Sequence, residues 1–125
     1  MSRAPGRGPD TLKTNAEFQR VFTEGFRFFR NGLGFYARSN GGEAFRFGIV
    51  APKRFGHAVD RNRFRRRVRE VIRLSPEVPP GFDVVICVGK PCGDLGFDVI
   101  RKTLLWAWSR IRRASPAAPD GVAGG

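Results

Sequence analysis

Seven of the thirteen residues from Arg61 to Arg73 are arginine, and Glu70 is the one acid among them. A guanidinium group binds phosphate through two parallel hydrogen bonds and stacks on planar rings. Exposed helices usually place opposite charges four residues apart, whereas Arg65 and Arg69 repeat the same charge, which costs stability unless an anion neutralises it. The spacing therefore favours contact with nucleic acid over a merely solvated helix face, which is the ordinary explanation of a charge run.

At 100° per residue, the segment from Ala58 to Leu74 forms an amphipathic helix. Its narrow apolar stripe, suited to docking on a sheet, consists of Phe64, Val68, Val71 and Ile72. The outward face gathers the residues expected to bind phosphate, which are Asn62, Arg65, Arg66, Arg69 and Arg73. Arg63 flanks this face, and Lys53 and Arg54 extend it before the helix begins. Arg61 lies beside the apolar stripe, so an anchoring role and an RNA contact are equally open.

Groups that could cleave a bond are scarce by comparison. His57 is the only histidine, so no histidine pair is available for acid–base cleavage of RNA. Cys87 and Cys92 have no second cysteine pair, which argues against a zinc site, and no glycine-rich loop precedes a Lys-Ser or Lys-Thr pair. We expect no cofactor or metal held by the protein alone. A stand-alone metal-dependent nuclease stays an alternative, which cleavage by RNA-free protein would support.

A helix that recognises duplex DNA would be equally rich in arginine. The segment is not preceded by a helix-turn-helix pattern, and a helix backed by a sheet is harder to insert into a major groove. RNA is therefore the favoured polyanion.

Composition sets the bounds for the whole chain. Its 125 residues suit one domain, and a hydrophobic content of 41% suffices for a core. The net charge of +12 predicts a polyanionic partner. No apolar stretch approaches the roughly 18 residues of a membrane span, so no membrane partner is expected. The basic segment Met1–Asp10 is not followed by an apolar run, so no signal peptide is expected. With only two cysteines, a reducing, cytoplasmic setting fits best.

Hydrophobic patterning predicts one RNA-binding domain over residues 11–113, with disordered tails at 1–10 and 114–125. The expected element order is α-β-β-α-β-α, which leaves room for one further short strand. This order predicts an α+β fold, a two-layer sandwich in which about three helices pack on a small mixed sheet.

The first helix is expected to begin near Asn15, because Thr14 and Glu17 have the spacing of a capping box. Apolar residues follow at helical spacing, namely Phe18, Val21 and Phe22. Gly25 is expected to end the helix.

Two alternating segments, 33–38 and 44–50, are separated by the turn residues 39–42 and predict a β-hairpin. On the first segment Leu33, Phe35 and Ala37 should share one face, and Tyr36 and Arg38 the other. The continuous apolar run at 83–88 predicts a central strand buried on both faces. The last helix is expected over 97–113, where Phe97, Ile100, Leu104, Trp108 and Ile111 form a stripe.

The segment Lys53–Arg66, KRFGHAVDRNRFRR, resembles the signature of the bacterial ribonuclease P protein subunit, K-[KR]-x-G-x-A-V-x-R-N-x-x-[KR]-R. Other residues fit the family in the same order, namely Leu12-Lys13, Glu17-Phe18, Val21-Phe22, Phe35-Tyr36, Arg46 with Gly48, Asp83–Ile86 and Lys90-Pro91. The resemblance spans about Thr11 to Arg113. It departs at Pro52, where the family commonly has serine and where proline removes a backbone donor.

The resemblance implies a βαβ unit with a left-handed crossover, which is rare in proteins. It also implies that the arginine helix binds the catalytic RNA of ribonuclease P, with one protein per RNA, and that precursor tRNA is the substrate. The chain would then be the protein subunit of an endoribonuclease. Phosphodiester hydrolysis, with Mg²⁺ at the active site, belongs to the RNA in this family. The alternative is a basic ribosomal or RNA-assembly protein without a role in cleavage.

A further implication of the resemblance is a cleft between the first helix and the sheet that holds the single-stranded 5′ leader of precursor tRNA. Phe18, Phe22 and Tyr36 would offer ring faces there, since base stacking tolerates any leader sequence. Core packing is the alternative for the two phenylalanines, whereas Tyr36 projects from the strand face opposite Phe35. The residues expected to contact leader phosphates, with plain surface charge as the alternative, are Arg38, Arg46 and Lys90.

Overall fold

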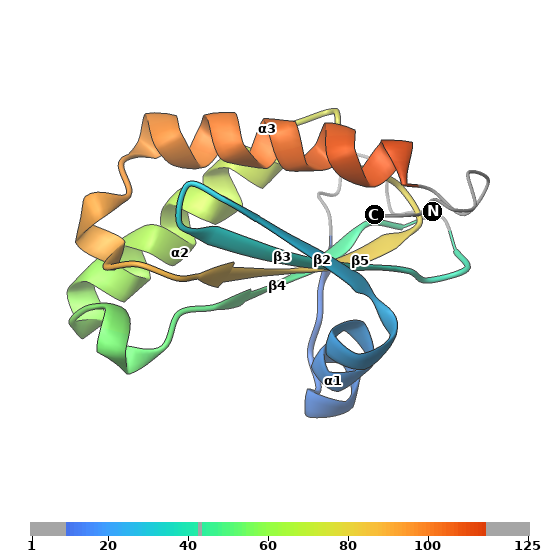
Figure 1. Cartoon of the computed structure of the whole chain (residues 1–125), viewed down its shortest axis with the longest axis horizontal. Coiled ribbons are helices and arrows are strands. Elements are labelled where there is room, and N and C mark those ends of the chain that lie inside the picture. Colours follow the sequence, from blue (N-terminus) through green and yellow to red (C-terminus); the bar gives the residue numbers. More distant parts are fainter. Residues whose placement is uncertain (1–9, 43, 115–125) are drawn as a thin grey trace.

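A mixed five-stranded sheet forms the centre of the structure, a computed structural model that describes residues 10–42 and 44–114. In chain order, the strands and helices are β1 (Asp10–Thr11), α1 (Asn15–Glu24), β2 (Phe26–Arg30), β3 (Leu33–Ser39), β4 (Arg46–Val50), α2 (Ala58–Arg73), β5 (Phe82–Val88) and α3 (Phe97–Arg113). Two short 3-10 turns are η1 (Lys53–Phe55) and η2 (Cys92–Asp94). Helices α2 and α3 pack on one face of the sheet, and α1 lies against the other (Figure 1). The predicted α+β fold is confirmed, with α1 added on the far face of the two-layer body.

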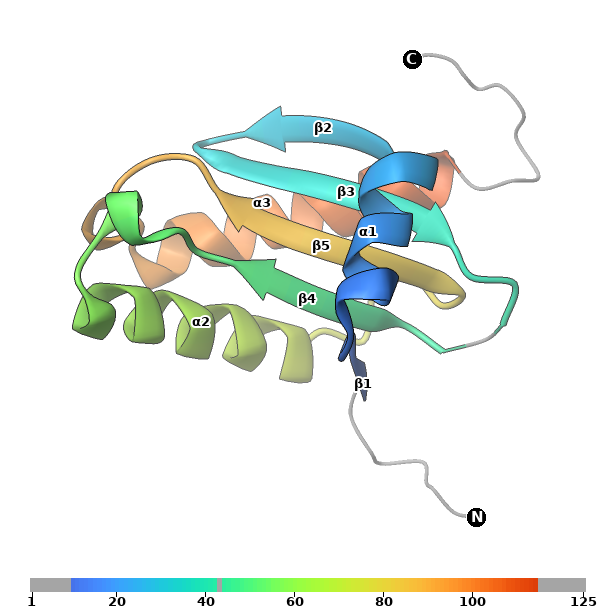
Figure 2. The same ribbon diagram turned by 90° about the horizontal axis from the view of Figure 1, so that it is seen from below.

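The central strand is β5, as the apolar run predicted. The strand order is β1-β4-β5-β3-β2, with β4 parallel and β3 antiparallel to β5. Helix α2 connects β4 to its parallel neighbour β5. Seen from the α1 side, α2 passes behind the sheet, which makes this crossover left-handed, as the resemblance implied (Figure 2).

The hairpin predicted between segments 33–38 and 44–50 is wrong. Strands β3 and β4 do not pair with each other, because β5 lies between them. Both segments are strands with the predicted faces, but periodicity fixes which face a residue occupies and not which strand lies beside it. The segment after β3 therefore passes the start of β5 at one end of the sheet. There the backbone amide of Asn40 donates to the carbonyl of Gly81 over a distance of 2.8 Å.

The hairpin partner of β3 is β2, which the sequence analysis did not identify. The two strands are joined by Asn31 and Gly32, whose φ angles of 52° and 80° are both positive. An Asn-Gly pair in this conformation suits the right-handed twist of a two-residue hairpin. At the other edge, Asp10 and Thr11 form β1 and pair with β4. Strand β1 thus includes Asp10, which was predicted to belong to the tail, and the other predicted tail residues, 1–9 and 115–125, lie outside the described ranges.

Most of the core lies between the sheet and the helices α2 and α3. The predicted stripe of α2 is buried in full, and so are four residues of α3, namely Ile100, Leu104, Trp108 and Ile111. The sheet contributes the predicted Leu33, Phe35 and Ala37 together with Phe47 and Ile86. Phe97, which was expected to extend the α3 stripe, is 36% exposed because it stands at the first position of the helix. This packing fixes the outward face of α2.

A smaller cluster seats α1 on the other face, where Val21 is buried against Leu12 and Val85. The helix begins with the predicted capping box, in which the hydroxyl of Thr14 accepts from the amide of Glu17 and the carboxylate of Glu17 accepts from the amide of Thr14. Backbone hydrogen bonds from Lys13 and Thr14 hold the pKa of Glu17 below its usual value. The start of α1 is therefore fixed by local hydrogen bonds, as the sequence predicted.

Gly25 ends α1 at a position where the backbone leaves no room for a side chain. A Cβ atom at this position would stand 2.7 Å from the carbonyl oxygen of Val21 and closer still to that of Ala37, and neither backbone oxygen can move away. Gly25→Ala should therefore lower the free energy of unfolding by about 1–3 kcal/mol, the usual cost of overpacking. The matched control is Gly93→Ala, because a Cβ there meets no atom within 4 Å. Equal urea midpoints for the two variants would contradict the constraint.

Candidate RNA interface

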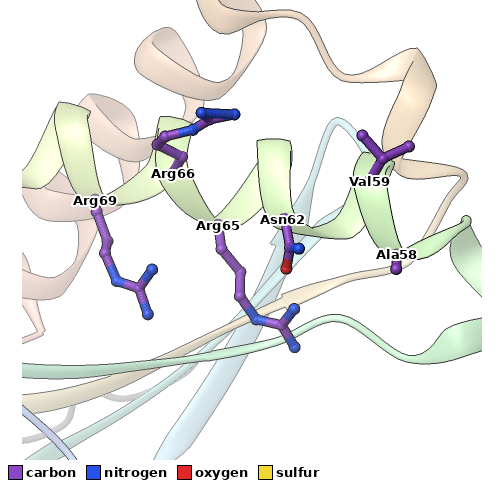
Figure 3. Close-up of a pocket in the computed structure, with 6 residues that line it drawn as sticks. All are labelled: Ala58, Val59, Asn62, Arg65, Arg66 and Arg69. Atoms are coloured by element: carbon purple, nitrogen blue, oxygen red, sulfur yellow. The ribbon is translucent and has the colours of Figure 1, made fainter.

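The outward face of α2 presents an open, concave surface. Its lining residues are Ala58, Val59, Asn62, Arg65, Arg66 and Arg69. The side chains of Asn62, Arg65 and Arg69 point to one side of the helix, and that of Arg66 points to the other (Figure 3). Within the described part of the chain, these three arginines make no ion pair and no side-chain hydrogen bond. Three arginines without a carboxylate partner in the described chain, two on one side of the helix and one on the other, therefore line the face where the sequence predicted phosphate binding (Figure 3).

Three other arginines of α2, namely Arg63, Arg67 and Arg73, have partners in the protein. Arg63 lies 3.9 Å from Asp60, and Arg73 lies 2.7 Å from Glu70, which raises the pKa of Arg73 through their hydrogen bond. Arg67 donates to the carbonyl oxygen of Leu95 at 3.0 Å and so ties α2 to the segment before α3. The structure thus divides the predicted phosphate-binding set into free guanidinium groups at the centre and paired ones around them.

The residues before and at the start of α2 differ in their exposure. Lys53 and Arg54 are exposed in η1, and the Arg54 guanidinium lies 4.7 Å from the centre of the Phe55 ring. Arg61 is half-buried, and its Nε atom is buried without a hydrogen-bond partner among the described residues. Its stem lies near Gly56, so Arg61 packs against the turn that leads into the helix. Lys53 and Arg54 therefore continue the basic surface of α2, whereas Arg61 faces partly inward.

On the other face of the sheet, three aromatic rings line the junction with α1. Phe22 and Tyr36 meet edge to face, with their ring centres 4.8 Å apart. The Phe18 ring lies directly over Gly48, which leaves no room for a side chain at that position. All three rings are half-buried and pack around the Val21 cluster. Each ring thus packs partly against the core and keeps part of its surface exposed to solvent.

Arg38 and Arg46 are held by carboxylates. Arg46 donates two hydrogen bonds to Asp83, at 2.9 and 2.7 Å, and lies 3.1 Å from Glu17. The hydrogen bond to Asp83 raises the pKa of Arg46, and burial opposes this shift. Arg38 lies 2.8 Å from Glu24 and 3.6 Å from Asp83. A leader phosphate at either guanidinium would have to share it with these carboxylates.

Lys90 stands apart from those two arginines. It follows the end of β5, whereas Asp83, which binds both of them, lies at the beginning of the same strand. The stem of Lys90 crosses Gly32 in the β2–β3 turn, with its Cγ 2.7 Å from the place where a Cβ of Gly32 would stand. The structure therefore does not bring the three predicted phosphate contacts together.

Phe29, on the same face of the sheet as Tyr36, was missed by the sequence analysis, which considered Cys87 only as a possible zinc ligand. Phe29 on β2 is 64% exposed and lies on the same sheet face as Tyr36. Cys87 on β5 also faces this side, and burial raises the pKa of its thiol to about 11, so that it is uncharged at neutral pH. The Asn31-Gly32 pair, a typical hairpin turn, was the signal that could have revealed β2 and with it Phe29.

The described residues contain neither a candidate metal site nor a candidate membrane-spanning helix. No group of three or more His, Cys, Asp or Glu side chains is placed to hold a metal ion. No helix there has the length and apolar character required to span a bilayer.

Similarity to known proteins extends over nearly the whole described part of the chain. The sequence profile of the family described as Ribonuclease P matches residues 7–112. A ribonuclease P protein component from Roseiflexus sp. (strain RS-1) is 43% identical over 81 residues, which cover 64% of this chain and 66% of that protein. One from Bacillus mycoides (strain KBAB4) is 34% identical over 101 residues, or 79% of this chain and 88% of that protein.

Solved structures agree with this match. The RNase P protein from Thermotoga maritima superposes with a TM-score of 0.74 at 32% identity, covering 82% of this chain and 97% of that one. The RNase P protein from Staphylococcus aureus superposes with a TM-score of 0.72 at 27% identity, covering 80% and 93%. Fold, signature segment and overall similarity thus lead to one conclusion: the chain belongs to the ribonuclease P protein component family.

Proposed function

We propose that this chain binds the catalytic RNA of ribonuclease P through α2, and that the rings at the junction of α1 with the sheet form a groove for the 5′ leader of precursor tRNA. In this role it promotes the endonucleolytic removal of the leader that produces the mature 5′ end of tRNA. The setting is the cytoplasm, and one protein binds each catalytic RNA. The observation that carries the proposal is the outward face of α2, which Arg65, Arg66 and Arg69 line without a carboxylate partner in the described chain.

The physical argument for α2 is one of charge balance. Like charges on one helix face destabilise it, and the protein offsets this at the edges of the face, where Asp60 and Glu70 pair with Arg63 and Arg73. At the centre the charge is left uncompensated, and the backing of the helix against the sheet holds it in place. A polyanion with the spacing of a folded RNA backbone supplies the missing charge.

The argument for the groove rests on its chemistry. Half-buried rings offer stacking surfaces that do not depend on base identity, which suits leaders of differing sequence. The first helix fixes Phe18 and Phe22, and the sheet fixes Tyr36, so the rings are held in position before a ligand arrives. Pre-organisation of this kind lowers the entropy cost of binding.

The cleavage chemistry is assigned to the RNA, whose active site would hold the Mg²⁺ ions. The protein's part is electrostatic, because its positive charge lets two polyanions, catalytic RNA and precursor, approach each other. Reconstitution tests this division of labour. Precursor cleavage should require the catalytic RNA and should need less Mg²⁺ when the protein is present. Cleavage by the protein alone would mark a stand-alone nuclease, and no effect on the RNA would favour a ribosomal or assembly protein.

The first prediction concerns α2. Changing Arg65, Arg66 and Arg69 together to Ala should weaken binding to the catalytic RNA, because each loses a phosphate contact. The slope of log K against log salt concentration should flatten by about 0.7–0.9 for each lost contact. The fold should persist, since none of the three lies in the buried stripe of α2. Filter binding across a salt series measures both quantities.

A control variant separates this contact from general charge loss. Arg101, Lys102 and Arg113 are exposed on α3, and changing them to Ala removes the same charge from another surface. This variant should keep more affinity and a steeper salt slope than the α2 variant. Equal losses in two folded proteins would show that α2 is not the contact surface.

The second prediction is that no side chain near the signature breaks the bond. His57→Ala and Asp60→Ala, each assembled with saturating catalytic RNA, should change the single-turnover cleavage rate by less than about tenfold. The removal of a general acid or base usually costs about 10²–10⁴-fold. A loss of that size in either variant would overturn the assignment of the chemistry to the RNA.

The third prediction tests the groove. Tyr36→Ala should weaken binding of precursor tRNA by roughly 1–3 kcal/mol per stacked base, while mature tRNA, which has no leader, should bind the assembled complex as before. Tyr36→Phe keeps the ring and should keep the ratio of precursor affinity to mature affinity. If that ratio is unchanged in Tyr36→Ala while the melting temperature falls, the ring serves the core and the leader site lies elsewhere.

A further inference from the structure

Phe29 is the most exposed of the large hydrophobic side chains in the described chain, at 64%. It is not a loose surface ring, because it occupies space that Gly34 leaves empty. A Cβ atom on Gly34 would stand 2.8 Å from the Cε2 atom of Phe29 and 3.0 Å from its Cδ2 atom. The ring therefore rests on the backbone of β3, with its outer surface turned to solvent.

The position of Phe29 aligns it with the groove. Phe29 pairs with Gly34, and Gly34 pairs with Cys87, so the three lie in one row across the sheet. Tyr36 is the next residue of β3 on this face, and diagonal neighbours of this kind are about 7–8 Å apart, within reach of aromatic side chains. Helix α1 crosses the sheet near the start of β2 and leaves the far end of β2 and β3 uncovered (Figure 2).

Charge on this part of the face favours an anionic ligand. The strand positions on this part of the face, away from Arg38, Arg46 and Asp83, are Arg27, Phe29, Gly34, Tyr36, Val85, Cys87, Gly48 and Val50, and none of these is acidic. Asp83, the acid of β5 on this face, lies at the opposite end and is bound by arginines. The stem of Lys90 crosses the β2–β3 turn at Gly32, three residues after Phe29.

We propose that Phe29, seated on Gly34, is a second stacking platform for the single-stranded leader. The leader then runs from Tyr36 past Phe29 toward Lys90, along β3 and away from the arginines bound to Asp83. This assignment rests on the proposed leader groove and extends it to a residue on β2. It explains why Lys90 lies far from Arg38, since Lys90 serves a phosphate at the other end of the same path.

The cations near Phe29 also favour a nucleic acid over a protein as its partner. An exposed ring that docks on another protein is usually surrounded by apolar neighbours. Phe29 has Arg27 on the same face of its own strand and Lys90 beside the following turn, whereas Arg30 faces the other side of the sheet, where its guanidinium lies over the Trp106 ring. Aromatic rings interleaved with basic side chains are the pattern of single-stranded nucleic acid sites.

The test measures precursor and mature tRNA affinities of the complex assembled with the catalytic RNA. Phe29→Ala should weaken precursor binding by about fivefold or more and leave mature tRNA binding unchanged. Phe29→Tyr keeps the ring and should bind precursor normally. Gly34→Ala keeps the Phe29 ring but fills the space on β3 where the ring rests. It should weaken precursor binding as much as Phe29→Ala does. The control is Phe97→Ala, an exposed phenylalanine on α3 that should have no effect.

Leader length separates this platform from Tyr36. In a series of precursors with progressively trimmed leaders, the losses caused by Phe29→Ala and Tyr36→Ala should disappear at different lengths. If Tyr36→Ala weakens precursor binding and Phe29→Ala does not, the second platform is wrong and the groove stands. If neither has an effect, the leader groove itself is wrong. An equal loss of precursor and mature tRNA in Phe29→Ala would place Phe29 at another RNA surface and overturn the proposal.

Discussion

One buried carboxylate organises the junction of the sheet with its first helix. Asp83, at 1% exposure, is the second residue of the central strand and accepts hydrogen bonds from Arg46 and from the Asn40 side chain, with Arg38 3.6 Å away. A buried charge is tolerated only when its partners are in place. Since those partners come from β3, β4 and the turn after β3, Asp83 fixes the positions of both neighbours of β5.

The same arginines also bind α1. Glu17, near its start, contacts Arg46, and Glu24, at its end, contacts Arg38. The helix is thus held at two points over the sheet, and its apolar contacts fill the space between them. This network neutralises two arginines of the predicted RNA-binding set, whereas the central arginines of α2 remain available. Two groups of arginine that look alike in the sequence therefore have different roles in the fold.

Sequence patterns within one or two turns of a helix predicted much of this structure. The pairings between segments far apart in the sequence could not be predicted from such patterns. The capping box of Thr14 and Glu17 and the stripe that includes Phe64 act within one or two helical turns, so they predicted α1 and α2. The partnership of Arg46 with Asp83 spans 37 residues, and periodicity carries no information about it. The insertion of β5 between β3 and β4 was missed for the same reason, whereas β2 and the packing of Phe29 on Gly34 were missed although the local Asn31-Gly32 turn signals them. Only the resemblance implied the crossover that places β5 there.

The central position of β5 has a consequence for how the chain acquires its structure during synthesis. β2 and β3 are joined by a two-residue turn and can pair as soon as both exist, but β3 and β4 each need β5 as a neighbour. Long-range pairing of this kind slows folding, because a large loop must close before the contacts form. Helix α2 is made before β5, and its apolar stripe has no complete sheet to cover until then. On the ribosome, the basic helix therefore cannot dock on a complete sheet before Val88, the last residue of β5, has been made.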